Sequence, residues 1–246
     1  MTGGHPEPDY RAIWESKPSL RAVYADIYKQ MLEKAANGRI LEIGGGSGNF
    51  KDFAPTAIAS DITFAPWLDL VCDAQRLPFA KNSFGNVVMV DVLHHVENPV
   101  KALRGIADVL APGGRFIMCE PGITPLSGLF YKAFHQEPVD MSVDPMRDGD
   151  ISPNRHPWDS NQAIPTLLTT RFRGELAKQV PELRLVGLDF FSFVAYPLSG
   201  GFKRWSLLPI AVARPLLALE WSLRALFGRL AGFRLLAVYE KMPGAA

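Results

Sequence analysis

The stretch ILEIGGGSG, residues 40–48, decides the fold of this chain. An apolar run interrupted only by Glu42 is typical of a short buried strand. Four glycines then follow in close succession: Gly44, Gly45, Gly46 and Gly48. They allow a sharp turn and a close approach of the backbone to a ligand, because no Cβ stands in the way. A helix after such a loop presents free N–H groups, so the sequence predicts the ligand crevice of a doubly wound α/β sheet.

The rest of the chain alternates between short apolar runs and helical stretches. Strands are predicted at 39–43, 56–62, 68–73, 86–92, 115–119, 183–195 and 233–241, and helices at 10–36, 99–110, 123–134, 166–179 and within 202–232. This alternation predicts a mostly parallel sheet with helices on both faces. We interpret residues 1–246 as one domain, with a cofactor-binding core at 38–121 and cap-forming insertions at 122–182 and 202–232. The aperiodic part at 135–165 is interpreted as a lid or a disordered segment.

The composition is that of an ordinary globular protein. Of 246 residues, 48% are hydrophobic and 21% are charged, and the formal net charge is +1, so no overall field favours nucleic acid. Cys72 and Cys119 lie in separate apolar runs and are expected to be free thiols in a reducing compartment. Residues 1–20 lack the apolar segment of a secretory signal, so we expect a cytoplasmic protein.

Two carboxylates follow the second and third predicted strands. Asp61 ends the strand after the glycine loop, where an acid can bind both hydroxyls of a ribose. Asp73 ends the next strand and can accept a hydrogen bond from an adenine amino group. Their neighbours Ile62 and Ala74 complete the predicted nucleoside site. Each acid taken alone is equally explained as the cap of a turn, but two in succession after a glycine loop favour a nucleoside.

The spacing of the glycines separates two cofactors. Dehydrogenases that use dinucleotides have the pattern G-x-G-x-x-G, whose helix start faces a pyrophosphate. Here the pattern is E-x-G-x-G-x-G, and Asn49 and Phe50 follow it without a further glycine. S-adenosylmethionine has no pyrophosphate. Its amino-acid part can lie against the glycine backbone while Glu42 holds the loop and the ammonium group, so this spacing favours S-adenosylmethionine.

The chain resembles the class I S-adenosylmethionine-dependent methyltransferases, and among them the type 11 group near the enzymes of ubiquinone and menaquinone biosynthesis. The resemblance covers about residues 38–121 and rests on ILEIGGGSG, on DAQRLPF at 73–79, on SFGNVVMVDVLHHV at 83–96 and on LAPGGRF at 110–116. It implies a seven-stranded Rossmann-like sheet that closes with an antiparallel hairpin. The long insertion between the last two strands departs from the family pattern, and the motifs do not identify the methyl acceptor.

The same resemblance places Asp91, at the end of the fourth strand, near the methionine part of the cofactor. His95 can act as a general base on an acceptor hydroxyl, since an imidazole titrates near neutral pH. The alternative is that His94 and His95 only pack or form hydrogen bonds in a turn. Methyl transfer from a sulfonium is an in-line displacement that depends mainly on alignment and on exclusion of water. A base is therefore needed only if the acceptor must lose a proton.

The acceptor is expected to be bound by parts outside the shared core. The 122–182 insertion contains His135, His156, Trp158 and scattered acids without regular ligand spacing, so no metal site is predicted. Residues 202–232 combine basic residues with Trp and Leu, as in a helix that lies in a membrane interface. The alternative is a cap helix or a dimer contact whose apolar face is buried. Prolines and an arginine interrupt this stretch, so it is not expected to span a bilayer.

The sequence thus predicts methyl transfer from S-adenosylmethionine to a small-molecule acceptor that is lipid-like or lipid-linked, with peripheral membrane contact through 202–232. Nucleic-acid acceptors are disfavoured because the chain has no long basic groove or aromatic stacking motif. Two alternatives stay open: a nicotinamide-dependent oxidoreductase, and a non-catalytic partner subunit that binds S-adenosylmethionine. The oligomeric state and the methylated atom do not follow from the sequence.

Overall fold

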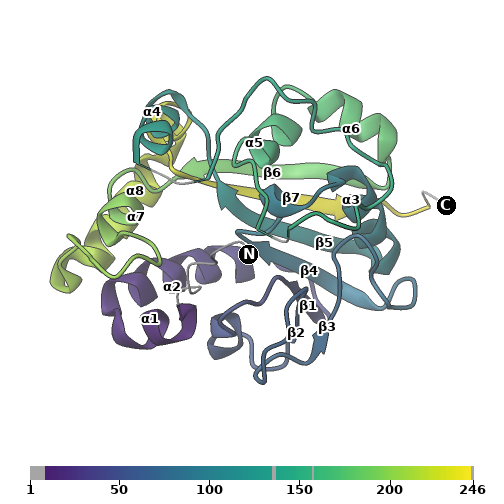
Figure 1. The fold of residues 1–246 in the computed structure, drawn as a ribbon, viewed down its shortest axis with the longest axis horizontal. Coiled ribbons are helices and arrows are strands. Elements are labelled where there is room, and N and C mark those ends of the chain that lie inside the picture. Colours follow the sequence, from purple (N-terminus) through teal and green to yellow (C-terminus); the bar gives the residue numbers. More distant parts are fainter. Residues whose placement is uncertain (1–8, 135–136, 157, 245–246) are drawn as a thin grey trace.

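Seven strands of the described residues form one sheet, in the order β3-β2-β1-β4-β5-β7-β6 (Figure 1). The computed structural model describes residues 9–134, 137–156 and 158–244. The strands are β1 (Ile40–Ile43), β2 (Ile58–Asp61), β3 (Leu70–Val71), β4 (Phe84–Val90), β5 (Leu110–Pro121), β6 (Leu183–Phe191) and β7 (Arg234–Lys241). The first five pair in parallel, whereas β7 lies antiparallel between β5 and β6. The predicted mostly parallel sheet with a closing antiparallel hairpin is confirmed.

Helices cover both faces of this sheet. They are α1 (Tyr10–Ser16), α2 (Pro18–Leu32), α3 (Pro99–Val109), α4 (Pro125–Phe134), α5 (Ile164–Thr169), α6 (Arg173–Gln179), α7 (Ala195–Ser199) and α8 (Ile210–Ala231), with the 3-10 helices η1 (Asn49–Asp52) and η2 (Leu93–His95). Because side chains alternate along a strand, β4 contributes Val87 and Met89 to the core under α3, α5 and α6. Val88 points the other way, into the core under α2 and α8.

Several predicted elements are shorter than the sequence pattern indicated. The helix predicted at 10–36 is two helices, because Pro18 has no N–H to continue α1 and instead begins α2. The helix at 166–179 is divided into α5 and α6. The helical part of 202–232 begins only at Ile210, directly after Pro209. The strand predicted at 183–195 ends at Phe191, and α7 follows it.

The prediction of a helix directly after the glycine loop is wrong. In its place is η1, a single 3-10 turn, and Pro55 lies shortly after it. Only residues 49–57 connect the loop to β2, which is too short a connection for a full helix and a return to the sheet. Ligand binding at this edge therefore depends on side chains and loop N–H groups rather than on the dipole of a long helix.

Close packing of α8 against β6 provides a test of this fold. A Cβ added at Gly228 would lie 2.1 Å from the carbonyl oxygen of Phe190, so Gly228→Ala must move the helix away from the strand. We expect this substitution to lower the free energy of unfolding by about 1–3 kcal/mol. Gly174→Ala on α6 is the matched control, since nothing lies within 4 Å of its added Cβ and alanine favours helix. Urea denaturation followed by circular dichroism measures both, and equal stabilities would contradict the packing described here.

Candidate functional site

A cavity of about 890 Å³ opens beyond the carboxyl ends of the parallel strands. Its lining includes every predicted site residue except Gly48, namely Glu42, Gly44, Gly45, Gly46, Asp61, Ile62, Asp73, Ala74, Asp91 and His95. Parallel strands place their carboxyl ends at the same edge of a sheet, which explains why residues far apart in the sequence meet there. The cofactor side and the histidine side of the predicted site thus share one cavity.

The glycine loop is held in a conformation that side chains would disturb. Gly44 has a φ of 77°, and a Cβ there would lie 2.1 Å from Cγ2 of Val92. Gly48 has a φ of 75°, and its Cβ would lie 2.5 Å from Cδ1 of Trp67. Since Gly48 is absent from the cavity lining, the structure explains it by packing against Trp67, and its predicted contact with a cofactor stays a prediction.

Glu42 places a buried carboxyl group beneath the glycine loop. Its side chain is 6% exposed, and Oε2 has no hydrogen-bond partner among the described residues. Burial, and then the neighbouring charge of Asp61, raise the pKa of Glu42 to about 8. A buried acid with a free oxygen at a cavity wall is suited to a ligand that brings a positive charge. The ammonium group of an amino-acid moiety meets this requirement.

Asp61 and Asp73 both line the cavity and both cap turns. Oδ2 of Asp61 accepts a hydrogen bond from the N–H of Gly46 at 3.0 Å, and Oδ1 accepts one from the N–H of Thr63 at 2.9 Å. Oδ1 of Asp73 accepts a hydrogen bond from the N–H of Gln75 at 2.8 Å. A carboxylate oxygen can accept more than one hydrogen bond. The capping role is therefore observed, and the ribose and adenine contacts stay predictions that it does not exclude.

Asp91 has partners that the sequence did not indicate. It lies directly after β4 with a φ of 58°, and its Oδ1 accepts a hydrogen bond from Nη1 of Arg234 at 2.6 Å. The hydroxyl of Tyr24 donates to Oδ2 at 2.9 Å. Arg234 is fully buried within β7, and sequence reasoning missed it because it begins a run that otherwise reads as a core strand. Asp91 thus faces the cavity with both oxygens already engaged.

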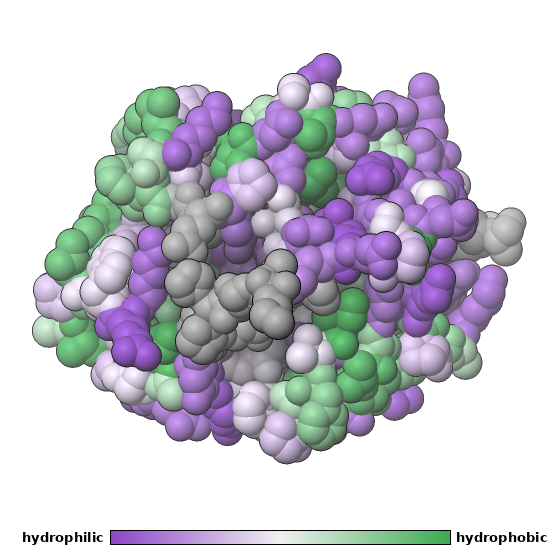
Figure 2. Space-filling view, viewed as in Figure 1, coloured by the Kyte–Doolittle hydropathy of each residue, from purple (hydrophilic) through white to green (hydrophobic). Residues whose placement is uncertain are grey.

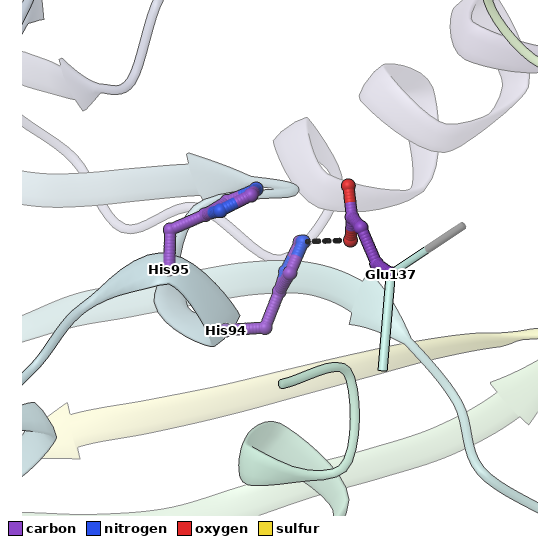
Figure 3. A group of neighbouring side chains, drawn as sticks. All are labelled: His94, His95 and Glu137. Carbon is purple, nitrogen blue, oxygen red and sulfur yellow. Dashed lines mark ion pairs between the residues drawn. The ribbon is translucent and has the colours of Figure 1, made fainter. Parts of the chain in front are cut away.

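His94 is buried and lies between two glutamates, Glu120 and Glu137. Figure 3 shows it beside Glu137 and His95. Its Nδ1 lies 2.6 Å from Oε2 of Glu120, and its Nε2 lies 3.3 Å from Oε2 of Glu137. Glu120 is oriented by the N–H groups of Val92 and Leu93, which both donate to its Oε1. Burial opposes a charge on His94, but the two glutamates raise its pKa to about 10. His94 is therefore a cation held by carboxylates, and neither glutamate carried a signal in the sequence.

His95 has the opposite character. Its ring centroid lies 4.1 Å from that of His94, and it lines the cavity with a buried Nδ1 that has no partner among the described residues. Burial, and then the charge of His94, lower the pKa of His95 below its usual value of 6.5. His95 is consequently neutral at pH 7, with a nitrogen free to accept a proton. Neither a packing role nor a base role is excluded by this arrangement.

The same residues form a potential metal-binding group. Ligand atoms of His94, His95 and Glu137 lie within 4.8 Å of one another. The hydrogen bonds favour a proton over a metal, because both nitrogens of His94 face carboxylates and a metal ligand needs a free lone pair. The sequence-based expectation of no metal stays a prediction. Of the histidines considered for a metal, His135 lies outside the described residues and His156 is exposed at the cavity wall.

Aromatic side chains form the other half of the cavity wall. They come from α1, α2, α4, α7 and the connecting segments: Tyr10, Tyr24, Tyr28, Phe130, Tyr131, Phe134, Trp158, Tyr196, Phe202, Trp205 and Phe233. Their rings contact one another edge to face, as Tyr24 does with Phe202 at 5.4 Å between centroids. This grouping could not be predicted from the sequence, because the residues are dispersed over more than 200 positions.

Part of the chain is similar to known methyltransferases. Residues 11–118 match the family described as a methyltransferase domain. The chain is 31% identical over 117 residues to the ubiquinone/menaquinone biosynthesis C-methyltransferase UbiE of Pseudomonas fluorescens, which covers 48% of this chain and 38% of that protein. It is 42% identical over 64 residues to the demethylmenaquinone methyltransferase of Mycobacterium tuberculosis, which covers 26% of this chain and 27% of that protein. The chain thus aligns with well under half of the length of these relatives.

A solved structure shows the same fold over most of the chain. A methyltransferase from Thermotoga maritima that depends on S-adenosylmethionine, described as a possible histamine N-methyltransferase, superposes with a TM-score of 0.57 at 15% identity. The superposition covers 91% of this chain and 91% of that one. At this identity the likeness shows the fold alone, which is the Rossmann-like methyltransferase fold that the sequence predicted.

The raised pKa of Glu42 leads to a test of its role toward a cofactor. If its carboxylate binds an ammonium group, binding at pH 7 must first remove a proton from most molecules. We expect the affinity for S-adenosylhomocysteine to rise about fivefold between pH 7 and pH 8, because Glu42 with a pKa of about 8 ionises there while the ammonium group of the ligand stays charged. Calorimetry measures this, and Glu42→Gln should bind weakly without the pH dependence. An affinity of the natural protein that does not change with pH would remove Glu42 from the ammonium site.

Proposed function

We propose, from the class I S-adenosylmethionine-dependent methyltransferase domain that this chain carries, that it transfers a methyl group from S-adenosylmethionine to a small lipid-like acceptor. One observation carries this proposal. The same cavity contains the glycine loop with its carboxylates and, across from them, a neutral histidine among aromatic side chains. Such a cavity can bring a polar cofactor and an apolar acceptor into contact away from water.

The residues on the cofactor side fit S-adenosylmethionine. The free oxygen of Glu42 suits the ammonium group, and the backbone of Gly44, Gly45 and Gly46 lines the cavity where we propose that the amino-acid part lies. Asp61 with Ile62 is proposed to hold the ribose, and Asp73 with Ala74 the adenine, since all four line the cavity beyond successive strands. Asp91 is proposed to border the methionine part. When bound, S-adenosylmethionine supplies an electrophilic methyl group on a sulfonium.

On the acceptor side, His95 is proposed to receive the proton of an acceptor hydroxyl. Its pKa is lowered by burial and by the adjacent cation His94, so its ring is neutral and can act as a base at pH 7. Glu120 and Glu137 hold His94 in place, and so keep that cation next to His95. The aromatic wall excludes water and aligns the acceptor, which supplies much of the rate of an in-line displacement.

Two lines of support favour a lipid-like acceptor. Both relatives are named for ubiquinone or menaquinone steps, and eleven aromatic side chains of the described part of the chain line the cavity. Aromatic surface interrupted by polar groups is suited to an apolar ligand that a few hydrogen bonds orient. Among the described residues, no helix is long and apolar enough to cross a membrane. We retain a cytoplasmic location with peripheral membrane contact as part of this proposal.

The alternatives make different predictions. A nicotinamide-dependent oxidoreductase would use a helix start to bind the pyrophosphate, whereas the loop is followed here by the single turn η1. Calorimetry with S-adenosylhomocysteine and with NADH separates these two cofactors. A non-catalytic partner subunit would bind S-adenosylmethionine and show no turnover with any extract.

The acceptor class is tested by transfer of a labelled methyl group. Purified protein, labelled S-adenosylmethionine and a total extract of the source cells are incubated, and the products are partitioned between organic and aqueous phases. We expect label in the organic phase, because the aromatic wall favours an apolar acceptor. Label confined to the aqueous phase would contradict a lipid-like acceptor and leave methyl transfer itself supported.

The base role is tested by His95→Gln. We expect kcat to fall by about 10²–10⁴-fold while the affinity for S-adenosylhomocysteine stays the same. In the natural protein kcat should rise with pH through a midpoint below 6.5. His95, whose pKa is lowered, loses its proton in that range and can then act as a base. His156→Gln is the matched control, since His156 lines the same cavity but is exposed. Full turnover in His95→Gln would show that the acceptor needs no base and that His95 only packs.

A further inference from the structure

We propose that one side of the molecule, the α4–α8 face, docks on the surface of an anionic lipid bilayer and places the mouth of the cavity there. The α4–α8 face consists of the exposed residues of α4, of α8 and of residues 203–209 between α7 and α8. The sequence indicated part of it, within 202–232, and packing of α4 against α8 adds the rest. Docking itself does not depend on the proposed function. Only its consequence rests on that function, namely that a lipid-like acceptor enters the cavity from the bilayer.

The α4–α8 face exposes large apolar side chains that the fold does not use. These are Leu126, Leu129 and Phe134 from α4, Trp205 and Leu207 from the connecting segment, and Ile210, Val212, Leu219, Leu226, Phe227 and Leu230 from α8. Leu226 is 76% exposed and Leu129 is 69% exposed. Figure 2 shows green, hydrophobic side chains gathered over α4 and α8, at the left of the view. An exposed apolar surface of this extent marks an interaction site.

The inner side of α8 is already packed, so its outer side has no partner within the described residues. Ala213, Leu217 and Gly228 are buried, and α8 contacts α2 and β6 along that side. The outer side presents exposed leucines at positions 219, 226 and 230, whose spacings of seven and four residues place them on one side of the helix. A helix with this arrangement lies along an apolar boundary instead of crossing it, consistent with the absence of a membrane-spanning helix among the described residues.

The charges on this face favour an anionic surface as the partner. Its exposed charged residues are all basic: Lys132 on α4, Lys203 and Arg204 before α8, and Arg214 and Arg229 on α8. Glu220 is the sole acidic residue in 122–134 and 200–232, and it is 4% exposed. Its Oε1 accepts hydrogen bonds from the N–H groups of Val194 and Ala195. No negative side chain of these two segments therefore opposes a layer of anionic headgroups.

The α4–α8 face is continuous with the cavity. Phe134 and Trp205 are 66% and 46% exposed, and both also line the cavity. Lys203 lines it too, and its Nζ donates to the carbonyl oxygen of Phe134 at 3.3 Å, which joins the two segments at this border. A bilayer seated on this face would meet the aromatic wall at its edge, so an acceptor with a hydrocarbon tail can enter the cavity without crossing water.

The test is co-sedimentation of the full chain with vesicles of phosphatidylcholine, with and without phosphatidylglycerol. We expect binding that requires phosphatidylglycerol and weakens with salt. The double variant Arg214→Glu/Arg229→Glu should bind at least about tenfold more weakly, since each basic residue near an anionic surface strengthens binding several-fold. Leu226→Glu should also weaken binding. Lys178→Glu on α6 is the matched control and should bind like the natural protein, because Lys178 is exposed and α6 packs on a different core from α8.

The other occupant of such a face would be a second copy of the chain. Light scattering of the natural protein and of Leu226→Glu distinguishes it: a dimer that the substitution dissociates, with no vesicle binding, would overturn the proposal. The proposal is also overturned if the double variant Arg214→Glu/Arg229→Glu and Leu226→Glu both bind vesicles like the natural protein. Calorimetry with S-adenosylhomocysteine and circular dichroism on the same variants show that fold and cofactor site are intact. Variants that lose vesicle binding but bind S-adenosylhomocysteine normally would support the proposal. A natural protein that does not bind S-adenosylhomocysteine would count against the proposed function only.

Discussion

The ion pair between Arg234 and Asp91 joins the parts of the chain on which the site depends. Arg234 begins β7, Asp91 follows β4, and Tyr24 on α2 donates its hydroxyl to the same carboxylate. Burial opposes the charge of Arg234, but Asp91 outweighs it and holds the pKa of the guanidinium well above its usual value. Removing Asp91 would leave the buried guanidinium of Arg234 without its charged partner, which costs about 3–5 kcal/mol. The N-terminal helices, the sheet and the closing hairpin are thus fixed together beneath the cavity.

Around this pair the protein holds three titratable groups away from their usual states. Glu42 is kept protonated at pH 7 by burial, His94 is kept cationic by Glu120 and Glu137, and His95 is kept neutral by burial and by His94. Two adjacent histidines therefore carry different charges because only one of them faces carboxylates. Strongly shifted pKa values within one cavity are typical of functional sites. The shifts come from neighbours, so the sequence motif His94-His95 alone does not determine them.

Local patterns predicted which residues meet at the edge of the sheet. The glycine loop, Asp61 and Asp73 each follow a strand within a few residues, so their positions at the edge of the sheet follow from strand order alone. The prediction of a helix after the loop was wrong, because the sequence pattern does not distinguish a helix from a single 3-10 turn until the length of the connection to β2 is known. Arg234, Glu120 and Glu137 were missed because their roles depend on contacts across the fold, which no periodicity shows.

The aromatic part of the cavity, which we propose binds the acceptor, is built differently, which explains why the sequence did not identify the acceptor. Its side chains come from segments dispersed along the chain, and polar contacts of loops join two of these segments, 17–19 and 201–206. Nζ of Lys17 donates to the carbonyl oxygens of Gly201 and Lys203, and Ser19 forms a hydrogen bond with Ser206. Burial lowers the pKa of Lys17 to about 8, so these carbonyls hold a charge that is costly to bury. The two halves are still coupled, because Tyr24 belongs to this aromatic wall and its hydroxyl donates to Asp91. Substitutions in residues 201–206 can therefore reshape the wall while the strands stay in place, whereas a substitution of Tyr24 would reach both halves of the cavity.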